Sequence, residues 1–215
     1  MNNKNSKTIT DKTPLKIILL GDVAVGKTNI ILRYLKNEFN EHSISTIGTT
    51  FSVKQIVKNN IEYILNIWDT TGQEMYRAVT KLFIQGAKIV ILVYSIEERK
   101  TFESLDYWYD TIKEICGENI IIAIVGNKTD LFEDLDETTI VPDEEGMEYA
   151  KKKNAIFKSV SAKKDRKGII SLFDLVLDEY IKKNTNENLK GKERTSIQIN
   201  NKNNNNNKDA KKKCC

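Results

Sequence analysis

The chain has 215 residues, 40% of them apolar, which suits one domain with a hydrophobic core, and its apolar runs are too short to span a membrane. Its three cysteines, two of them the adjacent Cys214 and Cys215, exclude a disulfide framework and are typical of a reducing cytosol. The net charge is +4, but residues 181–215 hold ten Lys and Arg against three Asp and Glu. This distribution argues against a nucleic-acid-binding domain and favours contact between the basic segment and an anionic surface.

Strand patterns alternate with helix patterns along the chain, as in a parallel sheet with helices on both faces. We expect strands at 15–20, 51–58, 61–68, 89–94, 120–125 and 155–160, and helices at 27–37, 100–115, 143–153 and 168–182. Asn59 and Asn60 tolerate left-handed backbone, so they indicate a hairpin between the second and third strands. The sequence predicts an α/β domain: a six-stranded, mostly parallel sheet with one antiparallel edge strand and about five flanking helices.

The two ends of the chain differ from this pattern. Residues 201–208 are mostly asparagine, and three lysines follow at 211–213. Such segments bury too little apolar surface to offset the entropy lost on ordering. We therefore expect a disordered extension at 1–13, one domain at 14–183 and a disordered tail at 184–215.

The segment Gly21 to Thr28, GDVAVGKT, follows the first predicted strand directly. It fits the pattern G-x-x-x-x-G-K-[ST], in which a loop before a helix points its main-chain N–H groups at phosphate oxygens. Lys27 then reaches the β- and γ-phosphates, and the Thr28 hydroxyl ligates Mg²⁺. The residues expected to bind nucleotide here are Asp22, Val23, Ala24, Val25, Gly26, Lys27, Thr28 and Asn29.

A second motif, WDTTGQE, closes the third predicted strand. Asp69 is placed to support a nucleotide-bound Mg²⁺ from outside the ion's direct ligands. Gly72 lets the main chain approach the γ-phosphate and donate its N–H. Gln73 has both a donor and an acceptor, which suits it to hold an attacking water in line. We expect Gln73, Lys27 and Gly72 to be the catalytic residues.

A third motif, Asn127-Lys128-Thr129-Asp130, follows the fifth predicted strand. The Asp130 carboxylate accepts hydrogen bonds from guanine N1–H and N2–H₂, a donor pair that adenine lacks. Asn127 ties this loop to the phosphate loop, and the Lys128 stem covers one face of the base. Main-chain N–H groups of Ser161, Ala162 and Lys163 face guanine O6. A P-loop kinase or ATPase fits less well, because Asp130 favours guanine.

Together these motifs resemble those of the small GTPases of the Ras superfamily over about residues 15–182, and the Rab branch fits best. The resemblance implies that Thr46 ligates Mg²⁺ and senses the γ-phosphate, and that Phe39 lies against the guanine. The segment from Ile47 and Gly48 to Phe51 is similar to the Rab switch I signature. The resemblance implies an effector-facing surface made by Ile47, Gly48, Phe51, Trp68 and Phe83.

The resemblance implies a monomeric GTP/GDP switch that hydrolyses GTP and recruits effectors to regulate vesicle traffic. Its partners are then an exchange factor, a GTPase-activating protein (GAP), effectors and a GDI-type escort. No arginine is evident near switch I, so hydrolysis is expected to be slow without a GAP. Val23 stands where many relatives have a small residue. The alternative is therefore a hydrolysis-impaired, largely GTP-loaded module that recruits effectors.

The adjacent Cys214 and Cys215 follow a lysine run. They resemble the doubly geranylgeranylated end of Rab proteins. Two lipids with a basic segment give stable anchoring, whereas one lipid gives only reversible binding. We therefore expect a lipid-anchored protein on the cytoplasmic face of an endomembrane, with a soluble cytosolic pool.

Overall fold

The computed structural model describes residues 9–41, 48–72, 77–133 and 140–185. Its strands are β1 (Ile9–Leu20), β2 (Thr49–Lys58), β3 (Ile61–Thr70), β4 (Ile89–Ser95), β5 (Ile121–Asn127) and β6 (Ile156–Ser159). Its helices are α1 (Lys27–Lys36), α2 (Arg77–Ile84), α3 (Arg99–Glu103), α4 (Leu105–Cys116), α5 (Asp143–Lys152), a short 3₁₀ helix η2 (Thr129–Leu131) and a helix over 166–185.

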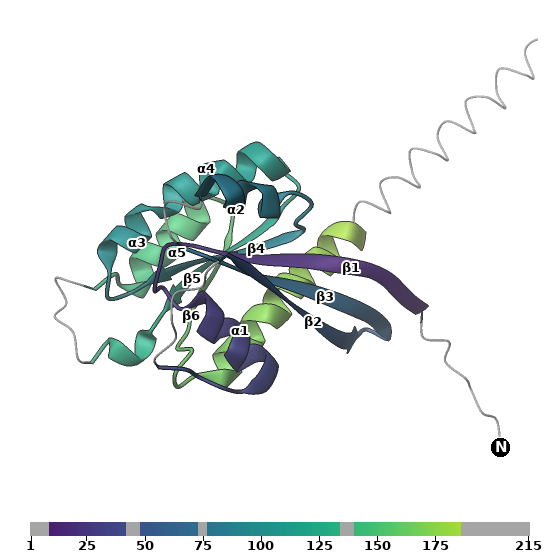
Figure 1. Cartoon of the computed structure of the whole chain (residues 1–215), viewed down its shortest axis with the longest axis horizontal. Coiled ribbons are helices and arrows are strands. Elements are labelled where there is room, and N and C mark those ends of the chain that lie inside the picture. Colours follow the sequence, from purple (N-terminus) through teal and green to yellow (C-terminus); the bar gives the residue numbers. More distant parts are fainter. Residues whose placement is uncertain (1–8, 42–47, 73–76, 134–139, 186–215) are drawn as a thin grey trace, which may run out of the picture. The chain divides into compact units, whose positions relative to one another are not determined.

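The six strands form one sheet in the order β2-β3-β1-β4-β5-β6 (Figure 1). Within the described residues, β2 and β3 pair antiparallel through the Asn59-Asn60 turn, and the other neighbouring strands pair parallel. Both turn residues have positive φ, as a tight hairpin requires. The predicted fold class is therefore confirmed.

Alternate residues of the central strands face the two sides of the sheet. Ile18 and Leu20 of β1 belong to a core that also holds Trp108 of α4 and Ala150 of α5. Figure 1 shows α1 on the opposite face from α3 and α4. There Tyr34 of α1 stacks on Phe173 with ring centroids 3.7 Å apart. Because both faces are covered, β4 and β5 are buried along their whole length.

The first strand begins earlier than its composition indicated. Residues 9–13 were expected to be part of a disordered extension, but β1 starts at Ile9, so that prediction is wrong for these five residues. Ile9 and Thr10 pair with the beginning of β3, and the register shifts between Thr10 and Pro14. Main-chain pairing needs no apolar side chains, and a proline is tolerated where a ladder is irregular. The rest of the predicted extension, 1–8, lies outside the described residues.

Two helical features also differ from the prediction. Helix α2 was not predicted, since its eight residues are too few to show a clear helical period. The single helix predicted at 100–115 is divided at Ser104, which is both the C-cap of α3 and the N-cap of α4. Serine favours such boundaries because its hydroxyl bonds nearby main-chain groups, here Thr101 O.

The chain divides into two compact units, Met1–Val176 and Leu177–Cys215. In the second unit the structure describes residues 177–185, which are helical. Among the described residues, none of the helices combines the length and the apolar character that a membrane span requires.

Candidate functional site

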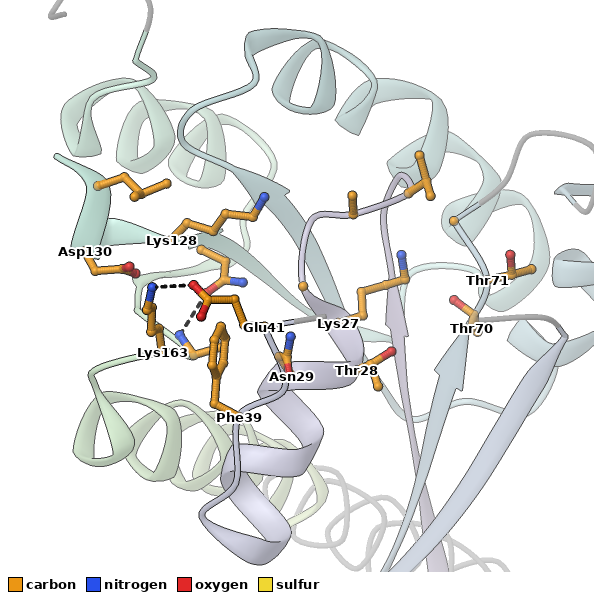
Figure 2. Close-up of a pocket in the computed structure, with 17 residues that line it drawn as sticks. Lys27, Thr28, Asn29, Phe39, Glu41, Thr70, Thr71, Lys128, Asp130 and Lys163 are labelled. Atoms are coloured by element: carbon orange, nitrogen blue, oxygen red, sulfur yellow. Dashed lines mark hydrogen bonds and ion pairs between the residues drawn. The ribbon is translucent and has the colours of Figure 1, made fainter. Parts of the chain in front are cut away.

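A pocket gathers most of the residues that the three motifs predicted (Figure 2). It lies where the loop after β1, the end of β3 and the loops after β5 and β6 meet, and its volume of about 400 Å³ suits a small ligand. The predicted residues that line it are Val23, Ala24, Gly26, Lys27, Thr28, Asn29, Phe39, Gly72, Asn127, Lys128, Asp130, Ala162 and Lys163.

Four lining residues were not among the predicted site residues: Glu41, Thr70, Thr71 and Leu131. The two threonines adjoin Gly72, so the second motif could have indicated them. Leu131 directly follows Asp130 and could have been included with the third motif. Glu41 belongs to no motif, and only the folded chain brings it to the pocket.

Three predicted binding residues lie behind the pocket wall rather than in it. Asp22 directs its carboxylate to Ser104 and Trp108, at 2.6 and 3.0 Å. Val25 is fully buried, and its main-chain oxygen accepts a hydrogen bond from Asn127 Nδ2 at 2.8 Å. The Ser161 hydroxyl donates to Asp130 Oδ1. The side chains of Asp22 and Ser161 and the main-chain oxygen of Val25 therefore stabilise the loops that carry the lining residues.

Lys27 is a buried cation at the base of the phosphate loop. Its amino group donates to the main-chain oxygens of Gly21 and Asp22, at 2.9 and 2.7 Å. Burial lowers the pKa of Lys27 to about 8, although the nearby carboxylates of Asp69 and Asp22 act in the opposite direction. A phosphate group beside this amine would favour its charged form, so the site is suited to an anionic ligand.

Thr28 and Asp69 bring a hydroxyl oxygen and a carboxylate together beside Lys27. The Thr28 hydroxyl donates to Asp69 Oδ2 at 2.7 Å. Asp69 Oδ1 is buried and has no hydrogen-bond partner among the described residues. Burial raises the pKa of this carboxyl, while the Thr28 hydrogen bond and the Lys27 charge oppose the rise. A hydroxyl next to an unsatisfied carboxylate oxygen fits a hard cation such as Mg²⁺.

Asn127 joins three loops around the pocket. Its Nδ2 donates to Val25 O, and its Oδ1 accepts from the Ala162 N–H at 3.1 Å. Gly26 has φ +96°, and a Cβ there would lie 2.3 Å from Asn127 Nδ2, so this close approach requires glycine. The phosphate loop and the loops after β5 and β6 are therefore held in one arrangement.

Asp130 is oriented toward the other end of the pocket from Thr28 (Figure 2). Since an ionised carboxylate has about four lone-pair sites, the bond from Ser161 leaves acceptor capacity for a ligand. Phe39 lines the same pocket after α1. An aromatic ring and an acceptor-only carboxylate suit a flat base with two adjacent donors.

The three predicted effector-facing aromatic residues contact one another outside the pocket. Phe51 lies 5.1 Å from Trp68, and Trp68 lies 5.8 Å from Phe83, between ring centroids. Phe51 is 49% exposed, so the cluster reaches the surface. Gly48 precedes β2, and its main-chain oxygen accepts the Thr71 N–H at 3.0 Å. Thr46, Ile47, Gln73, Cys214 and Cys215 lie outside the described residues.

Comparison with known proteins gives consistent results. Residues 16–182 match the family described as the Ras family. The GTP-binding protein ypt3 of Schizosaccharomyces pombe is 38% identical, over 81% of this chain and 79% of that protein. Ras-related protein Rab11C of Nicotiana tabacum is 38% identical, over 84% of this chain and 79% of its own length. Ras-related protein Rab11A of Lotus japonicus is 40% identical, over 76% and 70%.

Proposed function

We infer how the pocket is used from one premise: the chain belongs to the Ras family and, within it, to the Rab GTPases. The protein binds GTP and GDP, hydrolyses GTP to GDP and phosphate, and acts in vesicle-mediated transport. One observation carries our assignment of the site to this activity. A buried cation, Lys27, and an oriented carboxylate, Asp130, lie apart in the same pocket (Figure 2).

We propose that the phosphates of the nucleotide bind the main-chain N–H groups of residues 22–29 and the Lys27 amine. Asp130 accepts from the guanine base, and Phe39 and the Lys128 stem cover its faces. Asn127, Ala162 and Lys163 line the pocket around the base. The side chains of Asp22 and Ser161 and the main-chain oxygen of Val25 also hold these loops in place.

The same arrangement supports a place for Mg²⁺, held by the hydroxyls of Thr28 and Thr46 with Asp69 behind them. When bound, the ion neutralises charge on the phosphate oxygens. Thr28 and Asp69 are already hydrogen-bonded to each other, so their oxygen atoms need little reorganisation. Thr46 enters this proposal through the family resemblance alone.

We propose that hydrolysis depends on positioning: Gln73 orients the attacking water, Gly72 donates its N–H to the γ-phosphate, and Lys27 stabilises the developing charge. Arg33, close to the pocket, is held by the main-chain oxygens of Ala162 and Lys163 at 2.8 and 2.9 Å. It is therefore not placed to act as an arginine finger. We expect slow hydrolysis until a GAP supplies an arginine.

Binding of GTP would order switch I through Thr46 and switch II through Gly72, and effectors would bind that state. The cluster of Phe51, Trp68 and Phe83 reaches the surface at Phe51 and supports an effector surface, to which Ile47 and Gly48 are close in the sequence. An exchange factor, a GAP and a GDI-type escort complete the cycle of a monomeric switch.

The alternative of a hydrolysis-impaired module rests on Val23. This residue lines the pocket and is 46% exposed, so a branched side chain stands at the edge of the site. We favour the hydrolysing switch, and the effect of Val23→Gly on the rate of GTP hydrolysis separates the two.

Calorimetry on nucleotide-stripped protein with Mg²⁺ tests the site. GDP should bind far more tightly than ADP. Asp130→Asn should weaken GDP binding at least about a hundredfold, because guanine N1–H and N2–H₂ both lose a charged hydrogen-bond acceptor. Asp110→Asn, an exposed carboxylate on α4, is the matched control and should leave affinity unchanged. Equal affinity for GDP and ADP would overturn the assignment.

We also propose that residues 184–215 tether the domain 14–183 to the cytoplasmic face of an endomembrane through geranylgeranyl groups on Cys214 and Cys215, with the escort maintaining a soluble pool. The double variant Cys214→Ser/Cys215→Ser should become entirely soluble when expressed in cells, while binding GDP as before. Cys116→Ser is the control and should keep the membrane-bound fraction. A membrane-bound double variant would contradict lipid anchoring at these positions.

A further inference from the structure

Two lysines of the base-binding loops are each paired with a carboxylate. Lys128 pairs with Glu97, which does not line the pocket. Lys163 Nζ lies 2.8 Å from Glu41 Oε1, and both of these residues do line it. Glu41 follows α1, whereas Lys163 follows β6, 122 positions later. Figure 2 shows the Glu41 carboxylate turned toward Lys163, beside Phe39 and Asp130. The second pair therefore joins two segments at the base-binding end.

The main chain on the Glu41 side is fixed by Asn29 of α1. Asn29 Nδ2 donates to Asn40 O at 3.0 Å, and the Asn40 N–H donates to Asn29 Oδ1 at 2.9 Å. Asn29 is 7% exposed, so this reciprocal pair is shielded from water on the Asn29 side. Asn40 lies between Phe39 and Glu41, and its two bonds hold both neighbours in place.

The main chain on the Lys163 side is fixed by Arg33, one turn further along α1. Arg33 Nε donates to Ala162 O at 2.8 Å, and Nη2 donates to Lys163 O at 2.9 Å. Helix α1 therefore anchors both segments, and the Glu41–Lys163 ion pair closes a ring of contacts between them.

Exposed ion pairs usually contribute little, because two long side chains lose freedom when they pair. Here the two backbones are already held at the right separation, so less freedom is lost. The side chains remain 64% and 44% exposed, so salt should still screen their attraction. A modest effect that depends on ionic strength follows.

We propose that the Glu41–Lys163 ion pair is a clasp that slows the release of guanine nucleotide, with Glu41 as the positioning residue. The proposal rests on the function proposed above, in which Phe39 and Lys163 lie around the base. Moving the Phe39 segment away from the Lys163 loop, which widens the base-binding end, breaks this pair. Loss of the pair therefore lets the base-binding end open more often, and the nucleotide is released faster.

The rate at which excess GDP displaces mant-GDP tests the clasp at low ionic strength. Glu41→Gln should speed release roughly two- to fivefold, the range expected for a well-anchored surface pair. In a Lys163→Gln background, Glu41→Gln should have no further effect. The matched control is Glu118→Gln, which breaks the Lys113–Glu118 pair outside the pocket and should leave the rate unchanged.

The dependence of the release rate on salt distinguishes the clasp from a purely structural role, which would not make release depend on ionic strength. Raising NaCl from about 0.05 to 0.5 M should speed release from the unmodified protein toward the Glu41→Gln rate and change that variant less. Wild-type release rates in Glu41→Gln, or an equal effect of Glu41→Gln in both backgrounds, would overturn the clasp alone if GDP selectivity persists. Failure of the unmodified protein to retain mant-GDP would overturn the proposed function and the clasp with it.

Discussion

The Asp22 carboxylate accepts a hydrogen bond from the Trp108 indole N–H at 3.0 Å, across 86 positions of the chain. Asp22 belongs to the phosphate loop, and its main-chain oxygen accepts from Lys27 Nζ at 2.7 Å. Trp108 is 2% exposed and belongs to the core beneath α4. The same carboxylate also accepts from Ser104, where α3 meets α4. The loop after β1, proposed to bind phosphate, is therefore supported from the core by a helix that does not line the pocket.

Trp108→Phe should destabilise the protein by about 1–3 kcal/mol, because it removes a donor to a charged acceptor and leaves a small gap in the core. Urea unfolding at a fixed, saturating GDP concentration measures the change in the free energy of unfolding. In an Asp22→Ala background the gap remains but the hydrogen bond is already absent, so Trp108→Phe should cost about 1 kcal/mol less. An equal cost in both backgrounds would mean that the hydrogen bond contributes nothing.

Gly72→Ala should reduce the rate of GTP hydrolysis at least about tenfold, since small displacements near the reacting groups have large effects. A Cβ on Gly72 would lie 2.2 Å from the carbonyl carbon and oxygen of Asp22 and 2.3 Å from the Val23 nitrogen. These are main-chain atoms, so the phosphate loop or the Gly72 segment must move. Single-turnover phosphate release measures the rate.

The control for this substitution is Gly86→Ala. Gly86 has φ +76° and no atom within 4 Å of a built Cβ, so alanine there strains the backbone without crowding the site. It should lower stability and leave hydrolysis within about twofold of the unmodified rate. If Gly72→Ala hydrolyses GTP as Gly86→Ala does, the close contact with the phosphate loop has no catalytic importance.

The parts of the fold that follow from local patterns could be predicted. The strands β4 and β5 are continuous apolar runs, and buried parallel strands require such runs. The phosphate loop, Asp69 and Asp130 belong to short motifs whose spacing carries the chemistry. Candidate site residues that belong to such a short motif can therefore be identified from the sequence.

What could not be predicted depends on partners far along the chain. Glu41 lines the pocket and pairs with Lys163, 122 positions away, and no spacing rule links the two. The Asp22 side chain bonds Trp108 and Ser104, 86 and 82 positions away, and the phosphate-loop motif gives no sign of these contacts. Ile9 and Thr10 pair through their main chain with β3, which composition does not reveal. In each case the deciding contact forms only on folding.

Cys116 should react slowly with iodoacetamide at neutral pH, because burial raises the pKa of its thiol, although Lys16 and Lys88 oppose the rise. Only the thiolate reacts, so the rate should still be increasing with pH above the ordinary value of 9.0. The same shift means that the native thiol holds its proton while the unfolded thiol loses it. The contribution of Cys116 to stability is therefore present below pH 9 and is lost as the pH rises through the native pKa.

Mass spectrometry of the alkylated Cys116 peptide, in the Cys214→Ser/Cys215→Ser variant, gives the rate at each pH. The urea-unfolded protein is the control and should react with the pH profile of an ordinary cysteine. Shielding alone would lower the rate equally at every pH. A native profile parallel to the unfolded one would therefore show that the pKa is unchanged.

Val23→Gly should raise the rate of GTP hydrolysis about two- to tenfold, because a branched side chain at the pocket edge crowds the γ-phosphate, the attacking water or the arginine of a GAP. Val23 is 46% exposed, and its main-chain nitrogen adjoins Gly72, so it lies where the phosphate loop meets the segment after β3. Val23→Ser should have a similar effect without the added backbone freedom of glycine. Val57→Ser, at a valine 68% exposed on β2, is the control.

Single-turnover phosphate release measures the rate of hydrolysis and excludes any effect on nucleotide exchange. A gain in both Val23 variants supports a switch slowed by this one residue, and unchanged rates would remove the reason for the hydrolysis-impaired alternative.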